Sequence, residues 1–472
     1  MNLRNGRNVF SLTMILASLF FAGYALADGG QTPTTRPAEF GLIQTIRGNA
    51  PGLKPEQIKP DKYETGRCET MEGPYLVRAY SKWVYVLDPA RHDKGTGGTQ
   101  LHQFEKAADG TVTYKRDLAI PKELEGLGYN SCPNLLFKPL AAGKCIAYFN
   151  NFGWGGNSDL WRFSVDPDTG EMAVIGKTHT AAGPMVMSPD KKFIYISGNK
   201  TVQGFSLDDT TGEPAPLAAG LKTYGFNIAI ADDGKYVYTV EHESSDEGVK
   251  KGNDLQTALV SKRQALKQAG RDSKTQPDDA GLKRKIADLN ADIKALEKEW
   301  AACDKWYVCT CERDAATGAI GPAKGRVVMA ETQDVGLCNR LDFLHVFLAP
   351  QGNRVIVAWQ DSGYKPHWSA YARNAADGTV RFDCTKADAV WFKMDLVVSP
   401  GKTSGYYATY WEGGGVVGSF DWDDKEIYTN HQKLMEGVFQ SVDLDPATRT
   451  LYAVDMRESK LKVFRLGLGA GK

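Results

Sequence analysis

The stretch Ser188-Pro-Asp-Lys-Lys-Phe-Ile-Tyr-Ile-Ser197 decides the fold of this chain. It predicts a tight hairpin, because a turn rich in Pro, Asp and Lys separates an apolar run ending at Met187 from an alternating run beginning at Phe193. Similar turns return at Asp232-Asp-Gly-Lys235, Pro350-Gln-Gly-Asn353, Pro400-Gly-Lys-Thr403 and Pro446-Ala-Thr-Arg449. The fold therefore follows from a repeat and not from one hairpin.

Each repeat contains up to four short strands, and the turns recur at intervals of roughly 43 to 50 residues once one insertion is removed. This spacing is typical of the blades of a β-propeller. Seven units follow one another from about Tyr75, with six or eight blades as the alternatives. The last unit shows three strands, and an extra strand over 40–47 would complete it. The sequence thus predicts an all-β, seven-bladed β-propeller over 40–472, closed by strand 40–47.

A helical pattern replaces the strand pattern between Val240 and Trp306. A first helix is expected to end at Gly270. The second has a heptad seam made of Leu282, Ile286, Leu289, Ile293, Leu296 and Trp300. This predicts an antiparallel coiled-coil hairpin over 246–302, inserted between the second and third strands of blade four. The hairpin is either a partner-binding arm, an oligomerisation device or a cover, or an insertion that only buries its own seam.

The N-terminus has the pattern of a secretory signal peptide over 1–27. Arg4 and Arg7 precede an apolar run, and Ala25-Leu-Ala27 forms a cleavage site of small residues. An N-terminal membrane anchor is the alternative. Residues 28–39 form a polar leader that we expect to be flexible. No other stretch approaches about 20 apolar residues. We therefore expect a secreted or periplasmic protein without a membrane span after cleavage.

The composition excludes several classes of partner and cofactor. Lys plus Arg and Asp plus Glu both number 57, so the chain lacks the basic surplus of a nucleic-acid-binding protein. Eight cysteines in an exported protein suggest disulfides. No Cys-x-x-Cys-His motif attaches haem, and no His stands at zinc-ligand spacing. The sequence thus predicts no cofactor, although a Cys/His metal site is an alternative use of the cysteines.

Hairpins such as Ser188-Pro-Asp-Lys-Lys-Phe-Ile-Tyr and Asp232-Asp-Gly-Lys-Tyr-Val-Tyr resemble those of the lactonase-like seven-bladed propellers. That superfamily includes 6-phosphogluconolactonase-type enzymes and related cycloisomerases. The resemblance runs from about Tyr75 to the C-terminus, without the insertion. Its Gly-Pro-Arg-His-type segment corresponds here to Gly225-Phe-Asn227, and the following strand ends Glu241-His-Glu243, where the family has Asn-Glu. The resemblance implies lactone opening, with a carboxylate and an imidazole shifted in register.

Polar residues in the loops between strands are the candidates for a site, because propellers collect ligands at the mouth of their central channel. Lactone opening needs a base or an activated water, and a positive group beside the developing oxyanion. The predicted catalytic residues are Glu241, Arg340 and Asp342. The predicted ligand-binding residues are His242, Glu243, His367, Trp411, Glu412 and Arg457. A solvated loop at 241–243 and a plain ion pair between Arg340 and Asp342 are the structural alternatives.

Three functions follow from these observations. The first is a recognition protein that binds a small polar ligand or a protein partner through its loop face and its helical arm. The second is a lactonase-like hydrolase with a divergent active site. The third is a partner or sensor in periplasmic redox chemistry. An oligomer formed through the arm is a further possibility.

Overall fold

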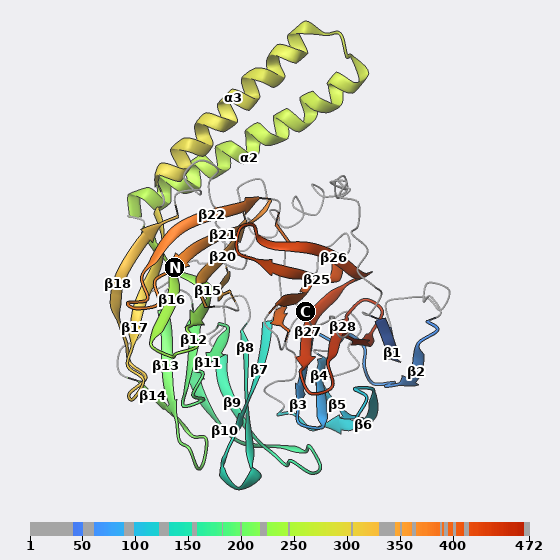
Figure 1. Ribbon diagram of the computed structural model, residues 1–472. Coiled ribbons are helices and arrows are strands. Elements are labelled where there is room, and N and C mark those ends of the chain that lie inside the picture. Colours follow the sequence, from blue (N-terminus) through green and yellow to red (C-terminus); the bar gives the residue numbers. More distant parts are fainter. Residues whose placement is uncertain are drawn as a thin grey trace, which may run out of the picture. The chain divides into compact units, whose positions relative to one another are not determined.

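A computed structural model describes most of the chain. The described residues are 41–50, 61–88, 99–121, 132–152, 158–181, 183–198, 201–217, 224–243, 246–303, 305–329, 345–349, 352–360, 365–387, 389–390, 395–399, 403–409 and 415–466. In this part of the chain the strands form seven sheets in chain order, and a helical hairpin interrupts one of them (Figure 1). The predicted seven-bladed β-propeller with an inserted helical hairpin is confirmed. The predicted signal peptide and leader lie outside the described residues.

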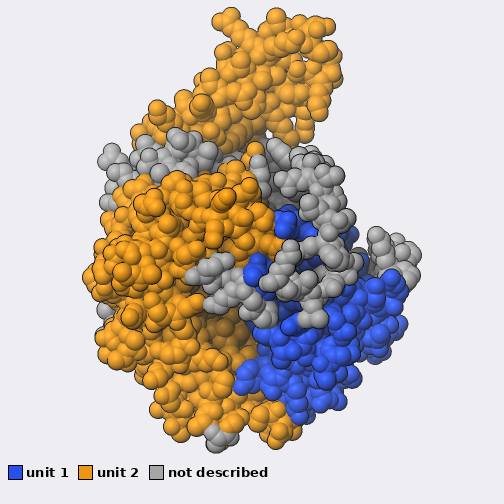
Figure 2. Space-filling view, in the orientation of Figure 1, with its two compact units in different colours: residues 1–126, 392–420, 430–472 blue, residues 127–391, 421–429 orange. Residues whose placement is uncertain are grey.

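The chain divides into two compact units, which are coloured separately in Figure 2. Unit 1 contains residues 1–126, 392–420 and 430–472, and unit 2 contains residues 127–391 and 421–429. Unit 1 thus holds blades one and seven and most of blade six. Unit 2 holds blades two to five and the tip of the last hairpin of blade six.

The blades of unit 1 begin and end the propeller. Blade one contains β3 (Leu76–Tyr80), β4 (Trp83–Asp88), β5 (Gln100–Lys106) and β6 (Val112–Leu118). Blade six contains β23 (Asp395–Val398), β24 (Ser404–Thr409), β25 (Gly415–Asp423) and β26 (Ile427–Gly437). Blade seven contains β27 (Phe439–Asp445), β28 (Thr450–Asp455) and β29 (Lys460–Arg465), joined by β1 (Gly41–Arg47) and β2 (Glu64–Arg67).

The blades of unit 2 follow the same antiparallel order. Blade two contains β7 (Cys132–Pro139), the short 3-10 helix η3 (Ala141–Gly143), β8 (Cys145–Phe152), β9 (Ser158–Val165) and β10 (Met172–Thr180). Blade three contains β11 (Met185–Met187), β12 (Phe193–Gly198), β13 (Thr201–Leu207) and β14 (Pro214–Pro216). Blade four contains β15 (Tyr224–Ile230), β16 (Tyr236–Glu243), β17 (Lys305–Arg313) and β18 (Ile320–Val328). Blade five contains β19 (His345–Leu348), β20 (Arg354–Gln360), β21 (Pro366–Arg373) and β22 (Val380–Ala387).

The last blade is completed by the start of the chain. Strand β1 pairs antiparallel with β29, and Gly41 lies opposite Arg465. Strand β2 then pairs parallel with β1 and adds a fifth strand to the sheet. The described part of the segment 48–73 therefore contains one strand. Its position is fixed by Asp61, which accepts hydrogen bonds from Thr45 Oγ1 at 2.7 Å and from Lys462 Nζ at 2.5 Å.

A repeated hydrogen bond joins neighbouring blades. In each case a tyrosine on the second strand of one blade donates to the carbonyl oxygen of a glycine in the turn between the third and fourth strands of the next. The pairs are Tyr148 with Gly212 (2.6 Å), Tyr195 with Gly318 (2.7 Å), Tyr238 with Gly378 (3.0 Å) and Tyr452 with Gly110 (2.9 Å). All four glycines have φ between +66° and +85°, the left-handed region that favours glycine. We call these pairs the tyrosine latches.

In two of the latches, an arginine on the third strand of the later blade also donates a hydrogen bond to the tyrosine hydroxyl. Arg313 donates from Nε to the Tyr195 hydroxyl at 2.7 Å and lies 3.3 Å from Asp190 through Nη2. Arg373 repeats this arrangement with Tyr238 at 2.6 Å and with Asp233 at 3.2 Å. Burial would raise the pKa of Asp190, but hydrogen bonds from Ser188, the Lys192 N–H and Arg313 lower it. Asp190 and Asp233, which lie in the turns that mark two of the repeats, thus also bind the arginine of the next blade.

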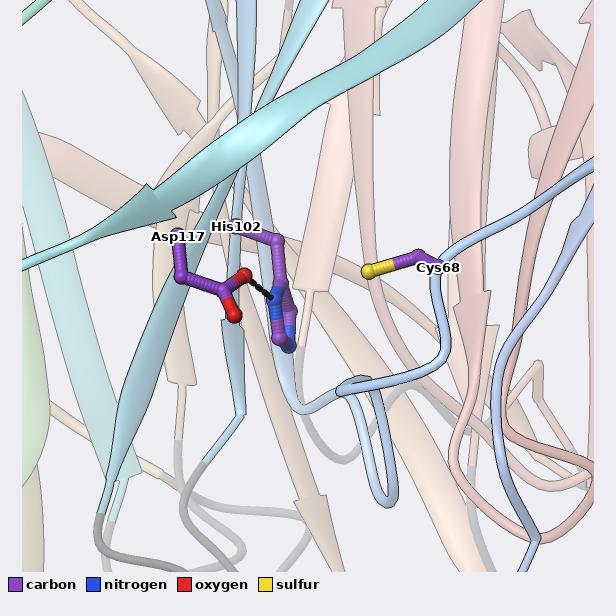
Figure 3. A group of neighbouring side chains, drawn as sticks. All are labelled: Cys68, His102 and Asp117. Carbon is purple, nitrogen blue, oxygen red and sulfur yellow. Dashed lines mark hydrogen bonds and ion pairs between the residues drawn. The ribbon is translucent and has the colours of Figure 1, made fainter.

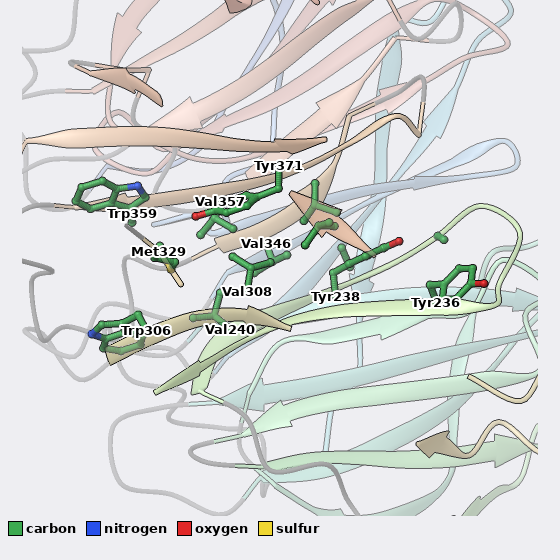
Figure 4. Packing of buried hydrophobic residues seen from close by; sticks show 14 residues of the cluster. Tyr236, Tyr238, Val240, Trp306, Val308, Met329, Val346, Val357, Trp359 and Tyr371 are labelled. Atoms are coloured by element: carbon green, nitrogen blue, oxygen red, sulfur yellow. The ribbon is translucent and has the colours of Figure 1, made fainter. Parts of the chain in front are cut away.

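The hydrophobic core lies between neighbouring sheets. Figure 4 shows the cluster between blades four and five, which includes Tyr236, Tyr238, Val240, Trp306, Val308, Val346, Val357, Trp359 and Tyr371. These side chains alternate along their strands, because successive residues of a strand point to opposite faces. Aromatic and β-branched residues fill this space with little conformational freedom to lose.

The hairpin consists of α2 (Asp246–Thr275) and α3 (Ala280–Cys303). Leu259 and Ile293 are buried in its seam, with Leu255, Leu266 and Leu296 packed against them. The ion pairs Lys262–Asp292 (2.5 Å) and Arg263–Glu297 (2.6 Å) join the helices beside this seam. Helix α2 continues past Gly270, where we expected it to end. No helix in the described part of the chain is both long enough and apolar enough to span a membrane.

Among the described side chains, Cys68, Cys309, Cys311 and Cys384 are free thiols. These four cysteines therefore do not form the disulfides expected from the even number of cysteines. Cys309 and Cys311 lie on β17 and are both buried. Burial, followed by the nearby carboxylate of Glu241, raises the pKa of each thiol to about 12, so both stay protonated.

Candidate functional site

Polar and charged residues gather on the first strands of three consecutive blades in unit 1. Strand β27 of blade seven lies beside β3 of blade one and β23 of blade six. In a propeller the first strand of each blade borders the central channel. The residues concerned are Arg78 on β3, Asp395 on β23, and Ser441 and Asp443 on β27. We call them the first-strand group.

The group is organised around the Arg78 guanidinium. Its Nη1 donates to Asp395 Oδ2 at 2.7 Å and to Ser441 Oγ at 3.1 Å. Ser441 Oγ in turn donates to Asp395 Oδ2 at 2.7 Å. Asp443 Oδ2 accepts the backbone N–H of Ala79 at 2.6 Å. One guanidinium from blade one is thus hydrogen-bonded to a carboxylate from blade six and a hydroxyl from blade seven, and the charge of Asp443, also from blade seven, acts on it as well.

The two carboxylates do not share the same electrostatic environment. Burial, with a smaller contribution from Asp395, raises the pKa of Asp443 to about 6, although Arg78 and the Ala79 N–H act in the opposite direction. Burial would lower the pKa of Arg78, but Asp395 and Asp443 raise it overall, so its positive charge is secure. Asp443 can therefore gain or lose a proton close to neutral pH, beside a permanent positive charge.

Some polar atoms of the group have no protein partner. Within the described residues, Nε and Nη2 of Arg78 and Oδ1 of Asp395 form no hydrogen bond. Arg78 and Asp395 are both partly exposed, at 18% and 14% of their side-chain area. The group therefore keeps donors and an acceptor that a bound molecule can reach.

The predicted catalytic residue Glu241 lies elsewhere, on β16 of blade four. Its Oε2 pairs with Arg326 Nε at 3.1 Å and accepts a hydrogen bond from Cys309 Sγ at 3.4 Å. The Arg326 guanidinium itself lies 4.0 Å from the centre of the Tyr307 ring. Glu241 is therefore engaged by side chains of its own sheet. The other two predicted catalytic residues, Arg340 and Asp342, lie outside the described residues.

The predicted ligand-binding residues are described only in part. His242 and Glu243 lie on β16, but their side chains are outside the described part, as are Trp411 and Glu412. His367 is mostly buried on β21, stacked on Trp359 with 4.4 Å between ring centres. Arg457 is exposed in the turn after β28. The structure thus brings none of the described members of this set into the first-strand group.

A second cluster contains the kinds of side chain that bind metal ions. Cys68, His102 and Asp117 in unit 1 place one potential ligand atom each within 4.8 Å of one another (Figure 3). Burial would lower the pKa of His102, but a hydrogen bond to Asp117 and the nearby Asp88 carboxylate raise it to about 11. No motif in the sequence indicates this cluster, because its residues come from three separate segments with no metal-ligand spacing. The first-strand group was missed for the same reason.

Comparison with known proteins gives matches to solved structures alone. No protein-family model matches the chain. No curated protein matches it either. A putative 6-phosphogluconolactonase from Bacteroides uniformis shares 14% identity over 80% of this chain and 92% of its own, with a TM-score of 0.47. A periplasmic gluconolactonase from Pseudomonas aeruginosa shares 12% over 77% and 85%, also with a TM-score of 0.47.

A third similar structure is the β-propeller domain of Swd1 from Myceliophteria thermophila. It shares 10% identity over 83% of this chain and 96% of its own, with a TM-score of 0.41. The hairpins of the sequence indicated a resemblance to lactonase-like propellers, and two of these similar solved structures are of that kind. At these identities and TM-scores it carries no statement about activity. The propeller fold rests on the seven sheets of this chain.

Proposed function

We propose that this protein is an exported β-propeller that binds a small polar ligand at the first-strand group. The observation that carries the proposal is the Arg78 guanidinium, held by Asp395 and Ser441 while its Nε and Nη2 stay without a partner in the described residues. A fixed guanidinium is a preorganised pair of donors, so little ordering is needed when a ligand binds.

The charge of the group favours one class of ligand. With Asp443 ionised, one positive charge faces two negative charges, so an anion is not favoured near neutral pH. A neutral molecule with several hydroxyl groups can accept from Arg78 and donate to the carboxylates. Sugars and their neutral derivatives meet this description.

The test is calorimetric titration of the full chain with a panel of neutral sugars, sugar lactones and sugar acids. A neutral ligand should bind, and Arg78→Gln and Ser441→Ala should each weaken that binding. Arg354→Gln is the matched control, since Arg354 pairs with Asp383 at 2.6 Å within unit 2 and is not a member of the first-strand group. Binding that survives Arg78→Gln unchanged would contradict the proposed site.

The helical hairpin supports a second binding role, toward a protein partner. Its apolar seam is filled by its own residues and is flanked by ion pairs, while Val260 of α2 is exposed. We expect a chain in which a short Gly/Ser bridge replaces residues 246–302 to fold as a propeller. If that protein still captures every partner of the full chain, the hairpin is not a binding arm.

Lactone hydrolysis is the alternative, and one observation favours it. Asp443, with a pKa of about 6, can act as the base, and Arg78 lies in the same group to stabilise an oxyanion. A pH-stat assay against sugar lactones should then show a rate that rises as the pH passes about 6, because Asp443 loses its proton. Asp443→Asn should abolish the rate and Glu241→Gln should preserve it. If instead Glu241→Gln abolishes the rate and Asp443→Asn preserves it, the active site lies at Glu241.

A further inference from the structure

The cluster of Cys68, His102 and Asp117 joins the first blade to the last. His102 lies on β5 and Asp117 on β6 of blade one, directly opposite each other in the sheet. Cys68 follows β2 at the edge of blade seven, and its N–H donates to the Arg47 carbonyl oxygen at 2.9 Å. The cluster therefore draws its side chains from both sides of the boundary where the propeller closes.

The three side chains point toward one another in Figure 3. His102 Nδ1 lies 2.6 Å from Asp117 Oδ1, and the Cys68 thiol lies on the other side of the imidazole. Cys68 and His102 are both fully buried, while the Asp117 side chain keeps 29% of its exposure. Ligand atoms around a tetrahedral zinc ion lie roughly 3.5 Å apart, so a set within 4.8 Å needs only small side-chain movements.

The surroundings of the second ring nitrogen of His102 also fit a histidine that binds a metal ion through its first ring nitrogen. His102 Nε2 forms no hydrogen bond within the described residues, and it faces Asp88 Oδ2 at 3.6 Å. Asp88 Oδ2 is itself fixed by the backbone N–H groups of Glu72 and Gly73. A histidine that binds metal through one nitrogen commonly directs the other toward a carboxylate, which holds the ring in place.

The surroundings of these polar groups are otherwise apolar. Cys68 belongs to a buried cluster with Ile46, Val77, Val84, Val86, Phe104, Tyr452, Val454 and Leu461. Burying an imidazole, a thiol and two carboxyl groups among such side chains is unfavourable unless something compensates their polarity. A bound cation would satisfy all of them together.

We propose that Cys68, His102 and Asp117 bind one divalent transition-metal ion, most suitably Zn²⁺, and that this ion fastens blade seven to blade one. Thiolate, imidazole and carboxylate together suit zinc, whereas magnesium and calcium take oxygen ligands. The fourth position falls to a water molecule, while Asp88 stays beside Nε2 and orients the ring. Such an ion adds a cross-link between two blades that the Tyr452–Gly110 latch and the Lys106–Asp445 ion pair already join.

The proposal is tested on the full chain after removal of metal with a chelator. Zn²⁺ should bind with a stoichiometry of one and raise the melting temperature, because it binds the folded state in preference to the unfolded state. Co²⁺ in its place should give a thiolate charge-transfer band in the near ultraviolet, which reports a cysteine ligand directly. Mg²⁺ should neither bind to the site nor raise the melting temperature.

Variants locate the site. Cys68→Ser should remove the cobalt–thiolate band, and Asp117→Asn should remove the zinc-induced rise in melting temperature. Asp88→Asn should weaken zinc binding by roughly 10- to 100-fold, as expected for a carboxylate that orients a ligand. Cys145→Ser is the matched control, because Cys145 is a buried cysteine in blade two.

Two results would overturn the proposal. One is a wild-type protein that takes up neither zinc nor cobalt, a result that does not depend on the folding of any variant. The other is a cobalt–thiolate band that persists in a folded Cys68→Ser protein, since the thiolate would then belong to another cysteine.

Discussion

The hydroxyl of Tyr195 donates to the carbonyl oxygen of Gly318 at 2.7 Å, so the second strand of blade three is tied to a turn of blade four. Arg313 binds the same hydroxyl at 2.7 Å. Both partners are buried, so neither finds water easily when the hydroxyl is removed. The tyrosine latches should therefore contribute measurably to stability.

We expect Tyr195→Phe to lower the free energy of unfolding by about 1–3 kcal/mol, because it leaves a buried carbonyl oxygen and a buried guanidinium nitrogen unpaired. Urea denaturation of the two proteins measures the difference. Tyr236→Phe is the control, since its hydroxyl makes one longer bond, 3.2 Å to the Ala376 carbonyl oxygen. An equal effect of the two substitutions would mean that the latch has no special role.

Gly318 should not tolerate a side chain. Its φ is +72°, and a Cβ there would lie 2.1 Å from Phe193 Cδ1, so Gly318→Ala meets both backbone strain and a clash. Gly143→Ala isolates the backbone effect, because Gly143 has φ +74° and open space around it. We expect Gly143→Ala to cost about 1 kcal/mol and Gly318→Ala clearly more. Thermal unfolding of both proteins makes the comparison, and equal losses would contradict the close packing at Gly318.

The Asp61–Lys462 pair should protect the protein against acid. Burial would raise the pKa of Asp61, but hydrogen bonds from Lys462, Tyr63 N–H and Thr45 lower it to about 2. A carboxyl group whose pKa is lowered by folding makes its full contribution to stability when the pH is above its pKa in the unfolded chain, near 4. This contribution is lost as the pH falls toward 2.

Asp61→Asn should accordingly reduce stability by about 2 kcal/mol at pH 7 and by little near pH 2. Urea denaturation at a series of pH values measures this loss. Asp168→Asn, at an exposed turn of blade two, is the control and should show no such dependence. A loss that is the same at every pH would assign Asp61 a role other than its charge.

Asp443 should have the opposite pH dependence. Its pKa, raised to about 6 by burial, means that the folded state resists ionisation of this carboxyl. Its contribution to stability should therefore be largest below about pH 4 and should decline as the pH rises through 6. The difference in unfolding free energy between wild type and Asp443→Asn should follow this curve. A constant difference from pH 4 to pH 7 would contradict it.

The repeat made the fold predictable because each hairpin has local causes. Ser188 Oγ accepts the Phe193 N–H at 3.0 Å, and Asp190 accepts the Lys192 N–H at 3.1 Å, all within one turn. Strand β2 escaped prediction because Glu-Thr-Gly-Arg has no apolar alternation and pairs only because β1 lies beside it. Helix α2 passes Gly270 because packing against α3 outweighs the weak helix propensity of one glycine.

The candidate sites could not be predicted from spacing. Arg78 and Asp395 are 317 residues apart, and the alternating pattern of their strands shows only that each occupies a first strand. His102 stands in Leu101-His-Gln-Phe104, which reads as an ordinary strand until Asp117 and Cys68 are placed beside it. Glu241-His-Glu243 drew attention because its residues are adjacent in sequence, which is not a requirement for sharing a site.

The pairing of the first strand with the last has a consequence for synthesis. Lys462 meets Asp61 across 401 residues of chain, and bringing such distant segments together costs roughly 5 kcal/mol of chain entropy. Strand β1 is synthesised early, and the edge of it that pairs with β29 stays without its hydrogen bonds until β29 has been synthesised. Completion of blade seven should therefore be the slow step of folding, and a chaperone that shields β1 during translation or translocation would act at the most vulnerable point of the molecule.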